Sequence, residues 1–168
     1  MIRRLYPQGY LESVYDLELD ILKKEGIKGI IFDIDNTLVP YDEKSPNDKL
    51  LEFFKKLEVN GFTVALVSNN NESRVALFNK DLKFVAYHKA CKPLIKNFNK
   101  VVKELGFNKE EVIMVGDQIF TDVYGGNLAG IRTYLVKPIS DKDEWVTKIK
   151  RGVEKKILKR YLKQNQNK

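Results

Sequence analysis

Cysteine and histidine are almost absent from this sequence. Cys91 is the single cysteine and His88 the single histidine in 168 residues. One cysteine excludes an internal disulfide and cannot by itself build a thiolate metal site. We therefore expect no redox framework. We interpret Cys91 as a small buried residue and His88, which has no evident partner carboxylate, as a surface residue.

Long apolar runs are also missing. The N-terminal segment carries Arg3 and Arg4 with no apolar stretch behind them, so it does not resemble a secretory signal peptide. No segment approaches the roughly 20 apolar residues that a membrane-spanning helix needs. The sequence therefore predicts a cytoplasmic protein.

Charge is unevenly placed along the chain. There are 30 Lys and Arg against 23 Asp and Glu, a net charge of +7. Residues 142–168 carry this whole excess, and residues 1–141 are neutral. We expect a basic amphipathic helix at about residues 143–162 and a frayed end at 163–168. Its apolar stripe would consist of Val146, Ile149, Val153, Ile157 and Tyr161.

This basic helix has two interpretations. It can lie on an anionic bilayer, which would place the protein peripherally at the inner face of the membrane. It can instead pack on its own domain, with its lysines simply solvated. No aromatic side chains are interleaved with the basic ones, so we expect no nucleic-acid partner. The sequence does not predict an oligomeric state.

The remainder of the chain alternates apolar runs with amphipathic segments. The apolar runs predict strands over residues 27–34, 63–68, 84–87, 111–115 and 132–136. Helical spacing and turn residues predict helices over residues 16–25, 45–60, 72–78, 93–105 and 121–129. Such alternation indicates a parallel sheet covered on both faces. We predict a single α/β domain over residues 1–168, with a doubly wound, three-layer, Rossmann-like sheet.

Polar side chains follow the predicted strands. In a doubly wound sheet, ligands bind beyond the carboxyl ends of the strands. The residues at those positions are Asp33, Asp35, Asn36, Thr37, Ser68, Asn69, Asn70, Lys92, Gly116, Asp117 and Asp122. Converging carboxylates repel one another unless a cation joins them, and oxygen ligands without a Cys or His cluster favour Mg²⁺. The sequence therefore predicts a magnesium site that shares its shell with a phosphoryl group.

The same residues suggest a reaction. A carboxylate is a competent nucleophile toward phosphorus, which would make Asp33 the site of an aspartyl-phosphate. Asp35, offset from Asp33, would protonate the leaving alcohol and later deprotonate the attacking water. Lys92 would balance the charge of the phosphoryl group. The predicted phosphate-binding residues are Ser68, Asn69 and Thr37.

Four stretches resemble, in order, the four motifs of the haloacid dehalogenase superfamily of phosphohydrolases. They are "FDIDNTLV", "VSNN", "CKP" and "GDQIFTDV". The resemblance implies that Asp33 is the nucleophile and Asp35 the general acid/base. It also implies that Ser68 is the phosphate-binding residue of the second motif and Lys92 the lysine of the third.

The resemblance also implies the ligands of the metal. Mg²⁺ would be bound by Asp33, by the main-chain carbonyl of Asp35 and by Asp117. Asp122 lies near the start of a predicted helix. It either supports these ligands from outside the metal shell or caps that helix.

The motif spacing leaves no room for a cap domain, because 35 positions separate Asp33 from Ser68 and 24 separate Ser68 from Lys92. An open site suits a phosphate carried on something large or on a surface. Residues 5–42 resemble the capless type IIIA branch, which includes phosphatidylglycerophosphate phosphatases. This resemblance implies a lipid phosphate substrate and a place in phospholipid biosynthesis. A soluble phosphorylated metabolite, nucleotide or protein is the alternative.

Two other functional classes share features with this sequence. A signalling receiver domain also has an acidic pocket, a hydroxyl and a lysine around Mg²⁺, but its lysine comes last. Here Lys92 precedes the Gly116-Asp117 pair, which argues against it. A non-catalytic scaffold on a phosphatase fold is the other class, and every catalytic position is filled here.

Overall fold

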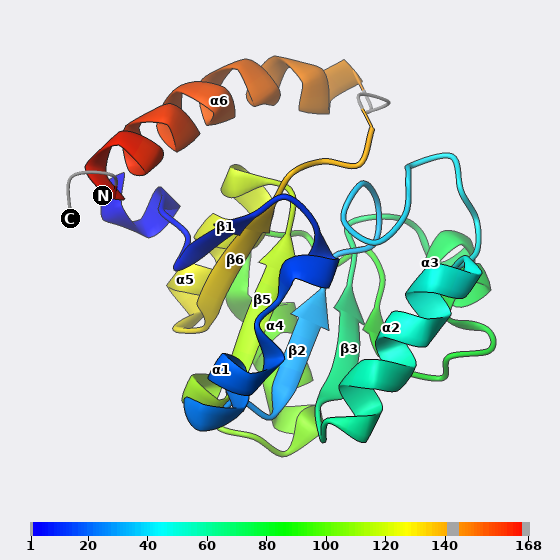
Figure 1. Ribbon diagram of the computed structural model, residues 1–168. Coiled ribbons are helices and arrows are strands. Elements are labelled where there is room, and N and C mark those ends of the chain that lie inside the picture. Colours follow the sequence, from blue (N-terminus) through cyan, green and yellow to red (C-terminus); the bar gives the residue numbers. More distant parts are fainter. Residues whose placement is uncertain (1, 141–144, 166–168) are drawn as a thin grey trace.

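A central parallel sheet organises the chain in the computed structural model (Figure 1). The structure describes residues 2–140 and 145–165, with side chains described except at 2, 145–151 and 165. The strands are β1 (Gly9–Leu11), β2 (Gly29–Phe32), β3 (Thr63–Val67), β4 (Val85–Tyr87), β5 (Val112–Gly116) and β6 (Arg132–Val136). Their order is β1-β6-β5-β2-β3-β4, and all neighbours are parallel. The predicted α/β, doubly wound sheet is confirmed.

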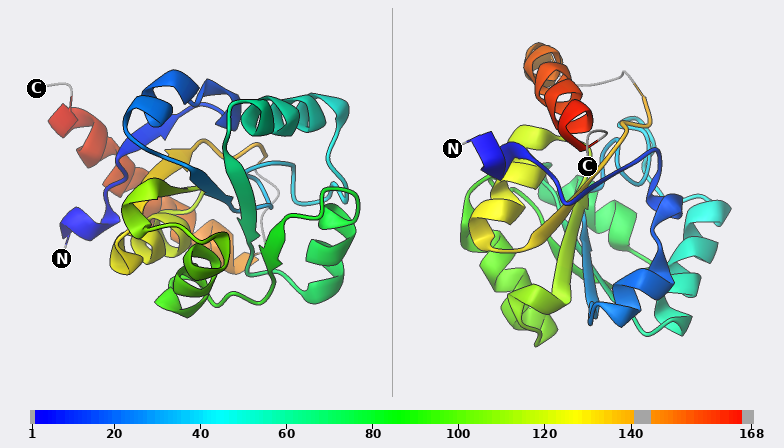
Figure 2. Two further views of the ribbon diagram at one scale, coloured as in Figure 1. Left: turned by 90° about the horizontal axis from the view of Figure 1, so that it is seen from below. Right: turned by 60° about the vertical axis from the view of Figure 1, so that its left-hand side comes forward.

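Helices cover both faces of this sheet (Figures 1 and 2). They are α1 (Leu19–Lys24), α2 (Asp48–Val59), α3 (Glu72–Asn79), α4 (Ile95–Leu105), α5 (Tyr124–Ala129) and α6 (Trp145–Asn165). On one face, Phe32 and Leu66 of the sheet share a core with Leu50 of α2 and Phe78 of α3. The opposite face packs Ile31 and other strand residues against α4 and α5. This is the expected three-layer arrangement.

The local sequence explains where the helices begin and end. Asn47 caps α2, since its side chain accepts a hydrogen bond from the Leu50 amide at 3.0 Å. The predicted start at Ser45 and Pro46 was therefore too early. At the end of α4, Gly106 adopts a left-handed conformation (φ 73°), which costs glycine little.

An additional strand, β1, was missed by the sequence reasoning. It pairs with β6 at the edge of the sheet, with Gly9 opposite Tyr134 and Leu11 opposite Val136. A three-residue strand is too short to show an alternating apolar pattern. The sheet therefore has one strand more than predicted.

The long helix α6 lies across the carboxyl side of β1 and β6 (Figure 1). Its Ile157 and Leu158 pack on a small core with Ile119 and Leu135. Within the predicted apolar stripe, Tyr161 is buried against the domain, whereas Val153 is 52% exposed. Val146 and Ile149 lie outside the described side chains. The helix continues to Asn165, beyond the predicted end at about 162, and residues 166–168 of the predicted frayed end lie outside the described residues.

Between Asp33 and Lys92 every residue is described, and this part of the chain contains only α2, β3, α3, β4 and their connecting loops. No cap domain is inserted there. Within this part of the chain, only loops lie over the carboxyl edge of the sheet.

Candidate active site

Asp33 directly follows β2, at the centre of the carboxyl edge of the sheet. Its amide donates to the carbonyl of Val115 at 3.0 Å, which extends the pairing of β2 with β5 to this residue. The residue is buried, and the Thr37 hydroxyl lies 3.3 Å from its Oδ2. The same hydroxyl lies 3.1 Å from Oδ1 of Asp117, which follows β5. Thr37 thus links two carboxylates, and its predicted contact with phosphate stays a prediction.

Lys92 lies between the carboxylates of Asp33 and Asp122. Its Nζ is 2.6 Å from Oδ1 of Asp33 and 2.6 Å from Oδ1 of Asp122. The lysine side chain is only 2% exposed, so these contacts are shielded from water. A buried ammonium with two anionic partners is a strong local source of positive potential.

Burial and charge act in opposite directions on this group. Burial alone would lower the pKa of Lys92, but Asp122 and Asp33 raise it above its ordinary value, so the ammonium stays protonated. Burial raises the pKa of Asp33 well above its ordinary value. Lys92 opposes that increase, and the neighbouring carboxylates add to it. Additional positive charge beside Asp33 would lower the pKa of its carboxyl group and favour the ionised form.

A cation between three buried carboxylates would supply that charge. Oxygen atoms of Asp33, Asp117 and Asp122 all lie within 4.8 Å of one another. Lys92 offsets one of these three negative charges, and hard carboxylate oxygens are the ligands that Mg²⁺ prefers. The residues therefore fit the predicted ion. The side chain of Asp35 lies outside this cluster, whereas the predicted ligand was its main-chain carbonyl.

Asp122 has a more definite place than the sequence indicated. Its Oδ1 accepts a hydrogen bond from Lys92 Nζ, and its Oδ2 accepts one from the Gln118 amide at 3.0 Å. Gln118 precedes η4 (Ile119–Val123), the π-helical turn that leads into α5. A side chain on Gly116 would collide with the Asp122 carboxylate, so glycine is needed there. Asp122 thus binds both Lys92 and the Gln118 amide at the start of the turn, while its predicted role beside the metal ligands stays a prediction.

The Ser68-Asn69-Asn70 turn after β3 links the other strands to this centre. Ser68 is buried, and its hydroxyl accepts the Asn70 amide at 3.0 Å. The Asn69 side chain accepts the Lys92 amide at 2.7 Å and donates to the Lys92 carbonyl at 3.3 Å. Asn69 therefore fixes the backbone of Lys92, while the predicted phosphate contacts of Ser68 and Asn69 stay predictions.

Asp35 lies apart from the buried cluster and has partners of its own. Arg74, in the first turn of α3, donates from Nε at 3.1 Å and from Nη2 at 2.9 Å to Oδ1 of Asp35. Asn70 donates to the other oxygen, Oδ2, at 3.0 Å. Sequence reasoning missed Arg74, although it follows the Ser68 motif closely enough to reach the same edge of the sheet.

The residues Cys91 and His88 do not join this centre. Cys91 is exposed, so the prediction of a buried cysteine is wrong. It lies in a turn with a φ of 52°, in the left-handed region, just before Lys92. His88 Nε2 lies 4.0 Å from Oε2 of Glu72. The His88 side chain is 40% exposed and that of Glu72 is 78% exposed.

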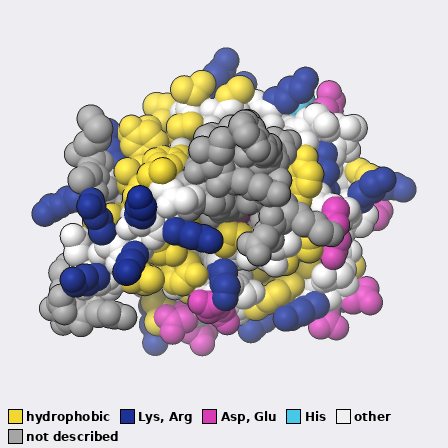
Figure 3. Space-filling model, turned by 90° about the horizontal axis from the view of Figure 1, so that it is seen from above, with side chains coloured by type: hydrophobic (Ala, Val, Ile, Leu, Met, Phe, Trp, Pro, Cys, Tyr) yellow, Lys and Arg dark blue, Asp and Glu magenta, His cyan; other side chains and the backbone are white. Residues whose placement is uncertain are grey.

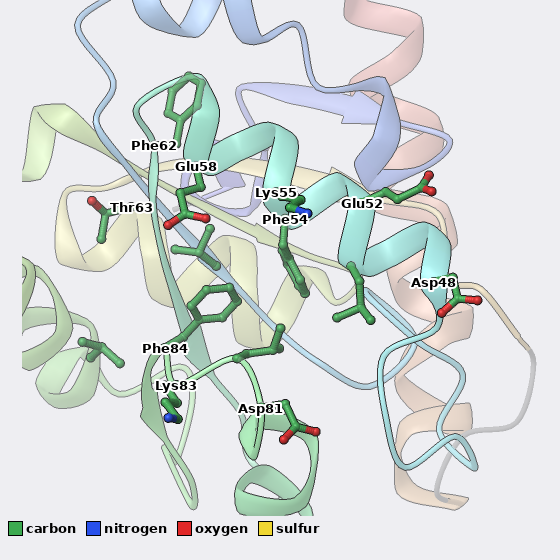
Figure 4. Close-up of a pocket in the computed structure, with 14 residues that line it drawn as sticks. Asp48, Glu52, Phe54, Lys55, Glu58, Phe62, Thr63, Asp81, Lys83 and Phe84 are labelled. Atoms are coloured by element: carbon green, nitrogen blue, oxygen red, sulfur yellow. The ribbon is translucent and has the colours of Figure 1, made fainter.

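A pocket of about 830 Å³ lies elsewhere on the surface, between α2 and the sheet (Figure 4). The rings of Phe54 and Phe84 lie there with centroids 5.1 Å apart. Its sheet residues, such as Thr63 and Val85, come from the amino-terminal ends of β3 and β4. The predicted site residues follow the opposite ends of the strands, and none of them lines this pocket. It is therefore not the catalytic site.

Comparison with known sequences agrees with this geometry. The chain is 39% identical over 159 residues to the probable phosphatase YqeG of Bacillus subtilis (strain 168), covering 94% of this chain and 92% of that protein. It is 34% identical over 167 residues to phosphatidylglycerophosphate phosphatase 1, chloroplastic/mitochondrial, of Arabidopsis thaliana. That match covers 90% of this chain but 47% of the plant protein, so the chain spans about half of that relative.

Comparison with solved structures agrees on the fold. The cobalt-bound deoxy-D-mannose-octulosonate 8-phosphate phosphatase (YrbI) of Haemophilus influenzae is similar with a TM-score of 0.57. The match covers 83% of this chain and 91% of that one at 18% identity, which supports the fold alone. A model of the haloacid dehalogenase-like hydrolases matches residues 40–130. With this match and a relative of 39% identity along nearly its whole length, the chain belongs to the haloacid dehalogenase-like hydrolase family.

Proposed function

We propose that the protein is a Mg²⁺-dependent phosphomonoester hydrolase that acts through an aspartyl-phosphate on Asp33. The observation that carries this proposal is the buried ammonium of Lys92, 2.6 Å from Oδ1 of Asp33 and next to three converging carboxylates. Phosphatase activity is further supported by the family and by the relatives that are named as phosphatases. The ligands would be Asp33, Asp117 and the main-chain carbonyl of Asp35.

When bound, Mg²⁺ would supply positive charge to Asp33 and to the phosphoryl oxygens. The protein's own groups act around it. Lys92 and the backbone turn at Ser68 would hold the phosphoryl group in line with Asp33. Asp122 keeps Lys92 in place, since its Oδ1 is 2.6 Å from Nζ.

The first half-reaction transfers the phosphoryl group to the protein. An oxygen of Asp33 forms a bond to phosphorus while the bond from phosphorus to the alcohol oxygen breaks. Asp35 donates a proton to that leaving oxygen. In the second half-reaction Asp35 takes a proton from water, the water oxygen bonds to phosphorus, and the acyl phosphate bond to Asp33 breaks. Inorganic phosphate leaves, and both aspartates return to their starting states.

A lipid phosphate is the proposed substrate. The site carries no cap between Asp33 and Lys92, so it can approach a phosphate at a bilayer surface. The plant relative is named as a phosphatidylglycerophosphate phosphatase. Among the residues that the structure describes, no helix combines the length and the apolarity needed to cross a bilayer. Access to a lipid would therefore come from surface binding by the described part of the chain.

Helix α6 is the proposed membrane contact. Figure 3 looks down on the side where α6 lies and shows Lys and Arg side chains gathered on part of that face. On α6 the exposed basic residues are Lys155, Lys156, Lys159, Arg160 and Lys163. Val153 and Leu162 are exposed among them, at 52% and 37%. Basic residues with scattered apolar ones suit an anionic bilayer.

A small cavity beside α6 also favours an amphiphilic substrate. Its volume is about 230 Å³, and it lies between β6, η4 and α6. Asp117 lines it together with apolar side chains, among them Ile119, Leu135 and Leu158. An apolar group could therefore be buried next to the proposed metal site.

The test is phosphate release with Mg²⁺ from phosphatidylglycerophosphate in mixed micelles and from a panel of soluble phosphomonoesters. Asp33→Asn serves as the blank. We expect a strong preference for the lipid and no turnover by the variant. Turnover confined to a soluble ester would refute the lipid substrate, and near wild-type turnover by Asp33→Asn would refute the mechanism. Absence of activity on every ester would favour a non-catalytic scaffold.

A further inference from the structure

We propose that Arg74 is a positioning residue that holds the Asp35 carboxylate in the orientation required for proton transfer. The inference rests on the proposed function, because Asp35 is the general acid/base of that reaction. Arg74 itself would touch neither the substrate nor the metal. Its contribution would be to fix which oxygen of Asp35 faces the reacting oxygen atom.

The contacts to Asp35 are unequal on its two oxygens. Oδ1 accepts two N–H groups from Arg74, at 3.1 Å from Nε and 2.9 Å from Nη2. Oδ2 accepts the Asn70 side-chain amide at 3.0 Å. A carboxylate oxygen has about two good acceptor positions, so Arg74 fills those of Oδ1. Oδ2 keeps one position, and the proton transferred to or from the reacting oxygen would be held there.

Arg74 is itself fixed from several sides. Its Nη1 donates to the main-chain carbonyl of Lys44 at 3.0 Å. Its amide donates to Asn71, the cap of α3, at 2.9 Å. The guanidinium lies 5.7 Å from the centroid of the Phe78 ring. Each of the three side-chain nitrogens therefore has an acceptor, which holds the guanidinium in one orientation.

Shielding from water makes this pair more than a surface contact. The side chains of Arg74 and Asp35 are 11% and 16% exposed. Exposed ion pairs are often too mobile to fix a geometry, whereas a shielded pair with two N–H bonds to one oxygen restricts rotation of the carboxylate. The Asn70 side chain restricts the other oxygen of Asp35. Asn70 is itself held in place because its main-chain amide donates a hydrogen bond to the Ser68 hydroxyl at 3.0 Å. The second motif thereby positions the general acid as well as the proposed phosphate site.

Leaving-group dependence separates positioning from a structural role. An alkyl phosphate needs a proton on its leaving oxygen, whereas p-nitrophenyl phosphate releases a stable anion without one. The ratio kcat/KM reports the steps up to the first irreversible transfer, and so excludes the later attack of water. We expect Arg74→Ala to lower kcat/KM for glycerol 3-phosphate about 30-fold, within the range that oriented proton transfer contributes. For p-nitrophenyl phosphate we expect a decrease of less than about threefold.

Two further measurements sharpen the test. In the Asp35→Asn background, Arg74→Ala should cost little more, because the group that it positions no longer transfers a proton. Guanidinium chloride at low concentration should partly restore alkyl phosphate hydrolysis by Arg74→Ala. Arg74→Lys keeps the charge but has no planar guanidinium to donate two N–H groups to Oδ1 in a fixed geometry. It should lie between wild type and Arg74→Ala, and it serves where the alanine variant does not fold.

Arg132→Ala is the matched control. Arg132 forms an ion pair with Glu25 at 2.6 Å, and the two side chains are 30% and 44% exposed. Its replacement should leave kcat/KM unchanged for both esters. Equal losses on both esters, or full additivity with Asp35→Asn, would overturn the positioning role while leaving the proposed function intact. If the wild type hydrolyses only phosphatidylglycerophosphate, the loss expected for an alkyl phosphate is measured on that lipid. A wild-type protein inactive on both esters and on phosphatidylglycerophosphate would refute the proposed function, and the inference with it.

Discussion

The three buried carboxylates predict that the metal-free protein is destabilised by its own active site. Oxygens of Asp33, Asp117 and Asp122 lie within 4.8 Å of one another. At that separation and an effective dielectric constant near 20, each like-charged pair costs at least about 3.5 kcal/mol. Lys92, partial protonation and the relaxation of side chains offset part of this cost. For Asp117→Asn, which keeps the shape and an acceptor for Thr37, we expect a net stabilisation of about 1–3 kcal/mol.

Thermal unfolding in EDTA and in Mg²⁺ measures this effect. In EDTA, Asp117→Asn should unfold about 2–12 °C above wild type for a chain of this size. Mg²⁺ should raise the unfolding temperature of wild type, by mass action on the folded state, and should have a much smaller effect on the variant. Asp81→Asn, at an exposed position, is the control and should change neither value. The reasoning fails if Asp117→Asn is no more stable than wild type in EDTA, or if Mg²⁺ stabilises both proteins equally.

Three more predictions follow from the site. Gly116→Ala should displace Asp122 and release Lys92, lowering kcat at least 10-fold on the scale of lost positioning; an unchanged kcat would contradict the packing. The pKa of Asp33 is raised in the folded state, and the stability that this contributes is fully present below the unfolded pKa of 3.8. That stability is lost as the pH rises through the folded-state pKa. In EDTA, Asp33→Asn should therefore stabilise the protein more at pH 8 than at pH 4. Equal gains at both pH values would refute this. Replacing Lys155, Lys156, Lys159 and Arg160 with Gln should weaken binding to anionic vesicles by roughly 10²–10³-fold, measured by co-sedimentation, while p-nitrophenyl phosphate hydrolysis is unchanged. Undiminished binding would exclude this face of α6.

The sequence predicted the sheet because each central strand is short, apolar and bounded by clear turn residues. β2 and β5 are buried along their full length, so their patterns left little ambiguity. β1 escaped because three half-buried residues at an edge carry no periodic signal. The pattern also did not separate buried from exposed members of the apolar stripe of α6, since Tyr161 is buried and Val153 is 52% exposed.

The site residues were predictable in kind but not in their mutual contacts. Acidic and polar residues after parallel strands must meet at one edge, which is why Asp33, Lys92 and Asp117 could be selected together. The hydrogen bonds between Asp35 and Arg74 join residues 39 positions apart, and no local spacing in the sequence predicts them. The hydrogen bond between Asn69 and the Lys92 backbone could not be predicted from the sequence either, because it depends on how two loops approach each other in space.

The central position of β2 has a consequence for local unfolding. β2 pairs with β3 on one side and β5 on the other, so Asp33 extends a strand that has no free edge. β1 and α6 lie at the periphery, and their exchange with solvent can proceed without opening that ladder. We expect amides of β2 and β5 to exchange their hydrogens only on global unfolding, and those of α6 to exchange much earlier. The surface that would meet a membrane can therefore rearrange many times within the lifetime of one intact catalytic centre.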